Sequence, residues 1–247
     1  MPDARGENDV TEMGRLERVK EEFMQVVSHE LRNPLQVIMG LVSLLRIDLK
    51  DPANQDEALR HLDLMKDQVA HVTALVEDVL MASRLSSGSL KLDLKRVDLV
   101  AILDQALSAY VDDPTHLWIT CTRAPSPVWL MGDVRRLGQV VVNLLSNAGN
   151  HTPPGKRIWA SVEVTAASAL LKVEDEGIGI PSGQLEQVFS GFHRAGNVTN
   201  WRSGGIGLGL YISRNIARRH RGDLWAENRP GGGTIMCLRL PLDGQPA

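Results

Sequence analysis

The sequence has 247 residues, of which 43% are hydrophobic and 23% are charged, and its formal net charge is −3 at pH 7. A chain of this length can bury the cores of one or two domains. The slightly acidic balance gives no support to bulk nucleic-acid binding, which needs a strongly basic face. The two cysteines, Cys121 and Cys237, stand far apart, as is typical of buried thiols in a reducing compartment. No apolar run approaches the roughly 18 residues of a membrane span and no leader opens the chain, so we expect a cytoplasmic protein without a span.

The first part of the chain predicts two long helices. Apolar residues recur at helical spacing from Leu16 to about Leu49, and Pro52 and Asn54 then mark a turn. A second helix carries a seam of apolar residues at alternating steps of three and four, as in a coiled coil: Leu62, Met65, Val69, Val72, Val76 and Val79. A lone hairpin of two such helices would leave apolar faces in water. We therefore expect a homodimer in which two hairpins form a four-helix bundle.

The helical pattern stops at Ser86 to Ser89, and Leu90, Leu92 and Leu94 then alternate with polar residues as in a strand. We place the domain boundary here, with residues 1–88 as the hairpin and residues 89–247 as a second domain. The pattern beyond predicts helices at 99–110, 133–148 and 206–220, and strands at 118–122, 128–131, 158–165, 169–175, 223–227 and 234–240. This mixture predicts an α+β two-layer sandwich, with a sheet on one side and helices on the other.

One turn of the first helix carries an unusual set of polar residues, in the stretch VVSHELRNPL. At 100° per residue, His29 lies about 170° from the local apolar stripe, so it should face solvent. Glu30 is adjacent, and Asn33 lies one turn further on. Most exposed helix histidines have no special role. A neutral imidazole is nevertheless a good nucleophile near pH 7, and a neighbouring carboxylate can fix its tautomer and accept its proton.

Two motifs of the second domain are suited to a metal ion and a base. NLLSNAGNHT places Asn143 and Asn147 four residues apart on one helix face, where amide oxygens can meet the oxygen preference of magnesium; a pair of surface asparagines is the plainer interpretation. In VEDEGIGIP, Asp175 can accept a hydrogen bond from an exocyclic amine, and Gly177 and Gly179 allow a base or sugar to approach the backbone. An acidic glycine-rich turn is common and is weak evidence alone.

A third motif, SGGIGLGL at residues 203–210, runs directly into a predicted helix. Free backbone N–H groups at a helix N-terminus, reached through glycines, form a phosphate site. The preceding residues 182–203 form a long loop of the kind that acts as a lid or is disordered. The three motifs together fit a metal ion, a base and a phosphate group far better than any one of them does.

From about Leu16 to Pro241 the chain resembles the sensor histidine kinases of two-component signalling. SHELRNPL resembles the phospho-acceptor box of that family, NLLSNAGNHT its asparagine box, DEGIGI and GGIGLGL its glycine boxes, and GGGT its last motif. The resemblance implies a dimerising phospho-acceptor hairpin followed by an ATP-binding domain of the gyrase, chaperone and histidine-kinase type, with ATP and Mg²⁺ as cofactors. The expected partner is the receiver domain of a response regulator.

The resemblance also assigns roles to residues. It implies that His29 accepts the phosphoryl group, that Glu30 polarises it, and that Asn33 orients a water molecule that removes phosphate from the partner. Asn147 would be the principal magnesium ligand, with Asn143 beside it. The implied nucleotide-binding positions are Asn143, Asn147, Asp175, Gly177, Gly179, Arg194, Gly205, Gly207, Gly209 and Thr234.

Two positions depart from the family pattern. Asn150 stands where a basic residue is common, and Ser190-Gly191 replaces the usual Glu-Pro of the phenylalanine box, here VFSGFHR. We expect Arg194 or Arg202 of the lid to compensate for the missing charge. The sequence favours an ATP-dependent protein-histidine kinase core that phosphorylates His29 and passes the group to a response regulator, with possible phosphatase activity as well. The alternatives are a non-catalytic nucleotide-binding scaffold and a chaperone- or gyrase-like ATPase, although the latter leaves the His29 hairpin unexplained.

Overall fold

The computed structural model describes residues 4–108, 118–122, 127–191, 193 and 206–243. They divide into two compact units, one that comprises the residues up to Val79 together with Ile206, and one that comprises the other residues from Leu80 on. No helix among these residues is long and apolar enough to cross a membrane. The elements in chain order are α1 (Ala4–Asp48), η1 (Pro52–Asn54), α2 (Gln55–Ser86), β1 (Lys95–Asp98), α3 (Leu99–Ser108), β2 (Trp118–Thr122), β3 (Trp129–Gly132), α4 (Val134–His151), β4 (Arg157–Val164), β5 (Ser168–Asp175), η2 (Ser182–Gln184), η3 (Gln187–Phe189), α5 (Gly209–Arg219), β6 (Asp223–Asn228) and β7 (Thr234–Pro241).

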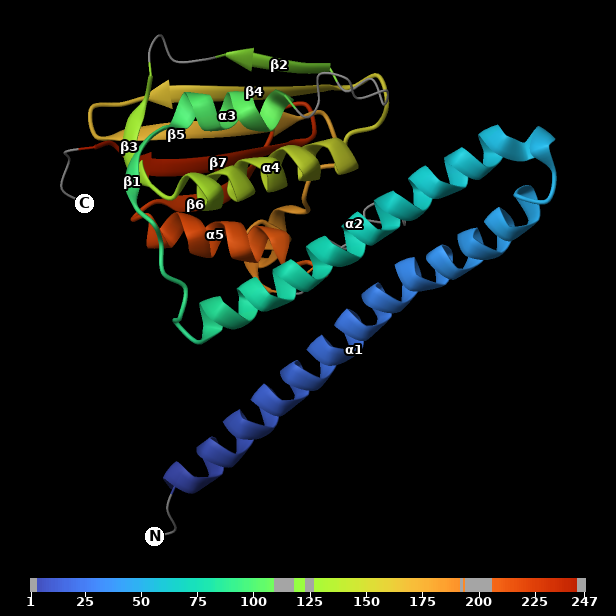
Figure 1. Cartoon of the computed structure of the whole chain (residues 1–247). Coiled ribbons are helices and arrows are strands. Elements are labelled where there is room, and N and C mark those ends of the chain that lie inside the picture. The colour runs from blue at the N-terminus through green and yellow to red at the C-terminus, as the bar shows by residue number, and fades with distance from the viewer. Residues whose placement is uncertain (1–3, 109–117, 123–126, 192, 194–205, 244–247) are drawn as a thin grey trace. The chain divides into compact units, whose positions relative to one another are not determined.

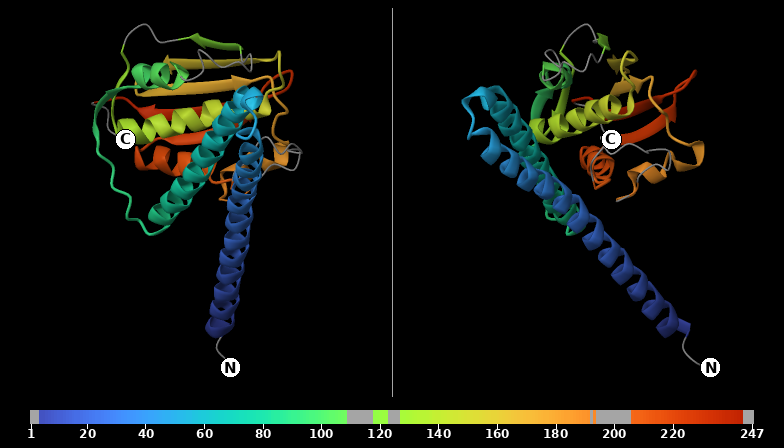
Figure 2. Two further views of the ribbon diagram at one scale, coloured as in Figure 1. Left: turned by 45° about the vertical axis from the view of Figure 1, so that its right-hand side comes forward. Right: turned by 90° about the vertical axis from the view of Figure 1, so that its right-hand side faces the viewer.

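The first unit contains α1 and most of α2, up to Val79, which lie side by side as the predicted hairpin (Figures 1 and 2). Asp51 caps the connecting turn by accepting the Ala53 N–H at 2.9 Å, and His61 Nδ1 lies 2.7 Å from Asp48 Oδ2 between the two helices. The predicted apolar seam of α2 remains accessible in the single chain, since its leucine and two of its valines are 43–54% exposed: Leu62, Val69 and Val76. The hairpin by itself therefore does not bury this seam.

The second unit is the predicted α+β sandwich. Its sheet has the strand order β2-β4-β5-β7-β6, in which β2 and β4 are parallel and the other pairs are antiparallel. Helices α3, α4 and α5 cover one face of the sheet (Figure 1). A separate two-stranded sheet pairs β1 with β3, and the sequence pattern did not predict this pairing.

Helix α4 forms because its start is capped and one face is apolar. The Asp133 carboxylate accepts the N–H groups of Arg135 and Arg136 at 3.1 and 3.2 Å, as an N-cap side chain should. The buried side chains recur every three or four residues, which is the signature of a helix with one face in the core: Leu137, Val140, Val141, Leu144, Leu145 and Ala148.

Two expectations from the sequence were wrong. Leu90 to Leu94 was expected to be a strand, but these residues lie outside any strand and β1 begins at Lys95. The loop from Ser182 was expected to lack structure of its own, but its described part contains the short helices η2 and η3. Local alternation cannot reveal whether a backbone partner exists for a strand, which explains the first error. A 3-10 helix of three residues is too short to show a periodicity, which explains the second.

Candidate functional site

The turn of α1 that carries His29 presents this side chain to solvent, as predicted. The His29 side chain is exposed, whereas Val27 and Pro34 on the same stretch are buried. Asn33 Nδ2 lies 3.4 Å from His29 Nδ1, which places the amide one turn along the same helix face. Glu30 is half-buried beside His29 in the chain. The three predicted residues therefore lie together on one turn of the helix.

The asparagine box lies in the last two turns of α4. The Asn143 amide N–H donates to the Ser213 hydroxyl on α5 at 3.0 Å. A Cβ on Gly209 would come within 2.4 Å of Asn143 Oδ1, so this oxygen faces the first residue of α5. Asn143 thus ties α4 to α5. Its role as a magnesium ligand stays a prediction, as does that of Asn147, which is half-buried one turn later.

Asp175, at the end of β5, organises the turn that follows it. The side chain is 5% exposed, and its Oδ1 accepts the N–H groups of Gly177 at 2.8 Å and Thr234 at 3.2 Å. Thr234 is the first residue of β7, so one carboxylate oxygen joins the first glycine box to the GGGT motif. The second oxygen carries no described bond to these backbone groups and is the one suited to an amine.

Three glycines make this close packing possible. A Cβ on Gly177 would lie 2.4 Å from the His151 carbonyl oxygen, and one on Gly233 would lie 1.8 Å from the Asp175 carbonyl oxygen. Gly233 also has φ of +100° and Gly179 has φ of +69°, a region that side chains other than glycine rarely adopt. The glycines are therefore needed by the fold of the site, whether or not a ligand approaches them.

Burial raises the pKa of the Asp175 carboxyl above its ordinary value. The N–H groups of Gly177 and Thr234 and the charge of Arg229 lower the pKa, but burial is the larger effect. A carboxylate held in this way is costly to ionise unless a hydrogen-bond donor meets its second oxygen.

The second glycine box leads into α5. Gly207 has φ of +72°, and Gly209 is the first residue of the helix, whose N-cap, Leu208, supplies no side-chain bond. The first backbone N–H groups of α5 are thus not capped by that side chain and are suited to phosphate oxygens. Gly205, Arg194 and Arg202 lie outside the described residues.

The phenylalanine box packs onto α5. Phe189 is buried, and the Arg214 guanidinium lies 4.9 Å above its ring. Arg214 also pairs with Glu186 and, at 3.5 Å, with Asp223. This part of the segment is therefore anchored against the middle of α5, even though Ser190-Gly191 departs from the family pattern.

Two buried polar atoms in the described part of the chain have no hydrogen-bond partner, Thr152 Oγ1 and His193 Nε2. Thr152 ends the asparagine box and follows His151, whose carbonyl accepts the Ile178 N–H at 3.2 Å from the first glycine box. An unsatisfied buried polar atom costs about 1–3 kcal/mol. An orphaned hydroxyl at this position, next to the Asp175 turn, fits a site that gains a polar ligand.

Sequence reasoning did not single out Ser213 or Thr152. Thr152 stands inside the quoted asparagine box and could have been found there. Ser213 lies four residues after Gly209 on the same helix face, but nothing in the sequence indicates that it accepts from an asparagine 70 residues away.

Two family models match the chain. Residues 19–88 match the His Kinase A (phospho-acceptor) domain, and residues 132–244 match the histidine kinase-, DNA gyrase B- and HSP90-like ATPase domain. The two matches cover the hairpin and the site around Asp175.

Curated relatives agree with these matches. The chain is 37% identical to the probable sensor histidine kinase TcrY of Mycobacterium tuberculosis over 90% of its own length and 46% of the relative. It is 30% identical to the sensor histidine kinase WalK of Bacillus subtilis over 94% of its own length and 38% of the relative. The chain therefore spans less than half the length of these relatives.

Solved structures resemble the chain as well. The Acinetobacter baumannii histidine kinase AdeS has a TM-score of 0.63 at 25% identity and covers 87% of this chain and 98% of its own. The mycobacterial sensor histidine kinase MprB has a TM-score of 0.53 at 29% identity, over 62% of this chain and 99% of its own. The histidine kinase ThkA, in complex with the response regulator protein TrrA, has a TM-score of 0.67 at 22% identity over 96% of this chain and 66% of its own. With an exposed His29, a glycine-lined Asp175 site and both family domains in order, the chain belongs to the sensor histidine kinases of two-component systems.

Proposed function

We propose that this chain is the kinase core of a two-component sensor. It transfers the γ-phosphoryl group of ATP to His29 and then to an aspartate in the receiver domain of a response regulator. It acts as a cytoplasmic homodimer in which a second hairpin covers the accessible seam of α2. The proposal rests on one observation above all, the presence in one chain of a solvent-facing His29 and a buried Asp175 carboxylate that backbone N–H groups hold in place.

The second unit supplies the nucleotide site. Asp175 would accept the adenine amine through its second oxygen, and the first turn of α5, reached through Gly207 and Gly209, would donate backbone N–H groups to the phosphates. Asn147, with Asn143 beside it, would hold Mg²⁺ through side-chain oxygens. The ion supplies charge neutralisation at the phosphates, which a loose phosphoryl transition state needs most.

The first unit supplies the nucleophile. Attack requires a ring nitrogen with a free lone pair. The tautomer that fits this role carries its proton on Nδ1, which leaves the Nε2 lone pair free. The Nε2 lone pair then forms the N–P bond while the bond to the bridging oxygen breaks and ADP leaves. Glu30 accepts the ring proton, so that the phosphorylated imidazole is neutral.

The same helix face is suited to phosphate removal from the regulator. Asn33 lies one turn from His29, so its amide can orient a water molecule near a phospho-aspartate that docks against His29. The complex of ThkA with TrrA supports a response regulator as the partner class. Replacement of Asn33 tests this phosphatase role separately from the kinase role.

The rival function is a nucleotide-binding scaffold without catalysis. Asn150 favours it, because the amide stands where the family commonly has a basic residue, and its Nδ2 lies 3.4 Å from Ser146 Oγ on its own helix. Retention of His29, Glu30 and Asn147 favours the kinase. The two functions differ in a single observable, the formation of phosphohistidine.

The test is incubation with γ-labelled ATP and magnesium, followed by separate acid and alkali treatment. The kinase proposal predicts label that is lost in acid and survives alkali, and its loss in His29→Gln without a change in ATP affinity. His71→Gln is a matched control, since His71 lies on α2 and is half-buried. Labelling of His29→Gln equal to wild type would reject His29, and absence of label in the wild type with normal ATP binding would favour the scaffold.

A further inference from the structure

The connection between α2 and β1 is held at two points by the helices of the second unit, to which it belongs. It comprises eight residues, 87–94, between Ser86 and Lys95. Its first three residues follow the end of α2; Gly88 among them has φ of +69°, and the hydroxyls of Ser87 and Ser89 donate to the Arg84 carbonyl. We call the remainder, residues 90–94, the strap.

The first attachment is made by α5. Arg219 Nη1 donates to the Leu90 carbonyl oxygen at 2.9 Å, and the Leu90 side chain is 7% exposed. A guanidinium donor gives a stronger hydrogen bond than a neutral one. Arg219 lies in the last turn of α5, so the strap begins where that helix ends.

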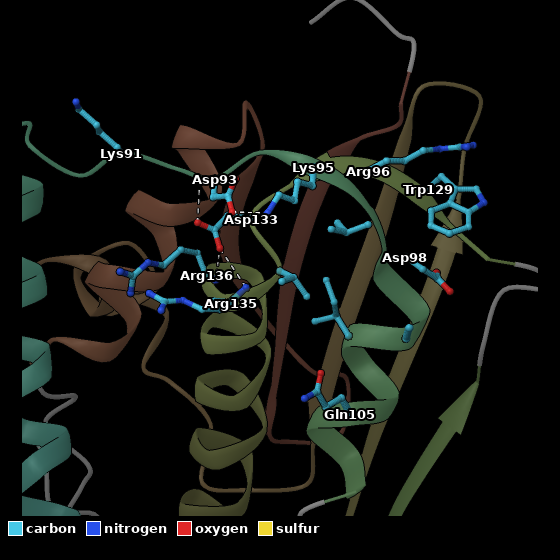
Figure 3. A pocket seen from close by; sticks show the side chains of 14 residues that line it. Lys91, Asp93, Lys95, Arg96, Asp98, Gln105, Trp129, Asp133, Arg135 and Arg136 are labelled. Carbon is cyan, nitrogen blue, oxygen red and sulfur yellow. Dashed lines mark hydrogen bonds and ion pairs between the residues drawn. The ribbon is translucent and has the colours of Figure 1, made fainter.

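The second attachment is made by the first residue before α4. The Asp93 N–H donates to Asp133 Oδ2 at 3.0 Å, while Asp133 Oδ1 caps the helix (Figure 3). Burial opposes ionisation of Asp133, but the N–H groups of Asp93, Arg136 and Arg135 outweigh it and lower the pKa. The carboxylate is therefore charged at neutral pH and holds the strap and the helix start together.

A buried histidine joins the two attachment points. The Asp133 N–H donates to His220 Nε2 at 3.0 Å, and His220 Nδ1–H donates to the Ile216 carbonyl at 2.8 Å. His220 is 4% exposed, and burial lowers its pKa, which agrees with the neutral ring that this bonding requires. The start of α4 and the end of α5 thus form one rigid base for the strap.

The strap is not packed into a core along its whole length. Lys91 and Asp93 line a cavity of about 640 Å³, whose other walls include Arg135 and Arg136 of α4 (Figure 3). Because one side of the strap faces this space, the two hydrogen bonds and the Leu90 side chain carry its attachment. Loss of a single bond should therefore free part of it.

We propose that Arg219 is a positioning residue for phosphoryl transfer, because it shortens the tether between the phospho-acceptor hairpin and the ATP-binding domain. This inference rests on the kinase function proposed above. With Arg219 in place, three residues, Ser87–Ser89, separate α2 from the first attachment; when the Arg219 bond is lost and Leu90 is released with it, six residues, 87–92, precede Asp93. Effective concentration falls roughly as the −3/2 power of tether length, so this doubling lowers the transfer rate about threefold.

The test compares Arg219→Ala with Arg218→Ala in the full chain. Arg218 is the matched control because it lies in the same helical turn and pairs with Asp223 at 3.5 Å rather than with the strap. Three quantities are measured: the rate of trypsin cleavage after Lys91, which is exposed, the rate of His29 phosphorylation at saturating ATP, and the affinity for ATP. Arg219→Lys keeps a cationic donor, so its cleavage rate and its phosphorylation rate should lie between those of Arg219→Ala and those of the wild type.

We expect Arg219→Ala to be cleaved several times faster after Lys91 and to phosphorylate His29 about threefold more slowly, with unchanged ATP affinity. Arg218→Ala should match the wild type in all three measurements. Unchanged cleavage would show that Arg219 does not hold the strap. Faster cleavage with an equal or higher phosphorylation rate, or a parallel loss of ATP affinity, would also overturn the proposal. If the wild type forms no phosphohistidine, the kinase function fails, while the cleavage measurement still tests the attachment.

Discussion

Asp175→Asn separates two contributions of this carboxyl, one to the fold and one to nucleotide binding. The substitution keeps the shape and one carbonyl oxygen. That oxygen can still accept the N–H groups of Gly177 and Thr234, which Asp175 Oδ1 accepts at 2.8 and 3.2 Å. The second oxygen is replaced by an NH₂ group. The turn should therefore keep its conformation while the group offered to adenine changes from acceptor to donor.

The effect on stability follows from the raised pKa of Asp175, which burial causes against the opposing hydrogen bonds. A carboxyl whose pKa is higher in the folded than in the unfolded chain contributes its full stability below the ordinary value of 3.8, and loses it as pH rises through the folded value. At neutral pH the wild type therefore carries the cost of a buried charge that the variant lacks. We expect the nucleotide-free variant to melt at the same temperature or higher at pH 7, and the difference to shrink as pH falls toward about 4.

The effect on binding has the opposite sign. A hydrogen bond to a charged group contributes about 1.5–3 kcal/mol, which corresponds to a rise in Kd of roughly 10- to 150-fold at 1.4 kcal/mol per decade. In the variant the NH₂ group of the asparagine would face the NH₂ group of adenine, so two donors would meet. We therefore expect the rise in Kd to lie near the upper end of this range. Loss of affinity without loss of stability is the combination that identifies a ligand-binding carboxylate.

The assay is calorimetric titration with a non-hydrolysable ATP analogue and magnesium, combined with thermal unfolding without nucleotide at several pH values. Glu174→Gln is a suitable control, because Glu174 precedes Asp175 on β5 and is half-buried. An Asp175→Asn Kd within twofold of the wild type would refute the role of Asp175 in reading adenine. A melting temperature lowered by several degrees at pH 7 would refute the sign of the stability argument.

Three further predictions concern single residues. Asn147→Ala or Asn147→Asp should weaken magnesium-dependent nucleotide binding, and wild-type affinity by calorimetry with magnesium present would exclude Asn147 as the ligand. Asn33→Ala should retain substantial His29 phosphorylation while dephosphorylation of a receiver partner falls about tenfold, the result of losing about 1.4 kcal/mol of water positioning; equal losses in the two rates would mean that Asn33 only supports the local fold. Among the described residues, Arg221 is the non-glycine residue with positive φ, at +59°. Arg221→Gly should therefore relieve about 1 kcal/mol of backbone strain and raise the melting temperature by roughly 2–4 °C. A lower melting temperature would show that the arginine side chain is stabilising.

The sequence alone was enough to predict the elements whose signals are local. The helix expected at 133–148 is α4, Val134–His151, because its N-cap and its apolar spacing are both contained in the segment. The strand expected at 118–122 coincides with β2. The exposure of His29 also followed from helical geometry, since one face of an amphipathic helix is defined by its own residues. The family motifs could also be located from the sequence, because each of them is one continuous stretch of residues.

The tertiary structure decided what depends on distant partners. Leu90 to Leu94 alternates like a strand, yet the bonds made by its ends go to Arg219 and to the Asp133 side chain, so no ladder forms. The Asn143 amide N–H meets Ser213, 70 residues away, a partner that nothing in its own segment indicates. Asp175 binds the Thr234 N–H across 59 residues. Local periodicity specifies which face of an element is apolar. The partner of a polar group is decided only when the elements pack, because each buried donor and acceptor must then form a hydrogen bond with a group that lies beside it.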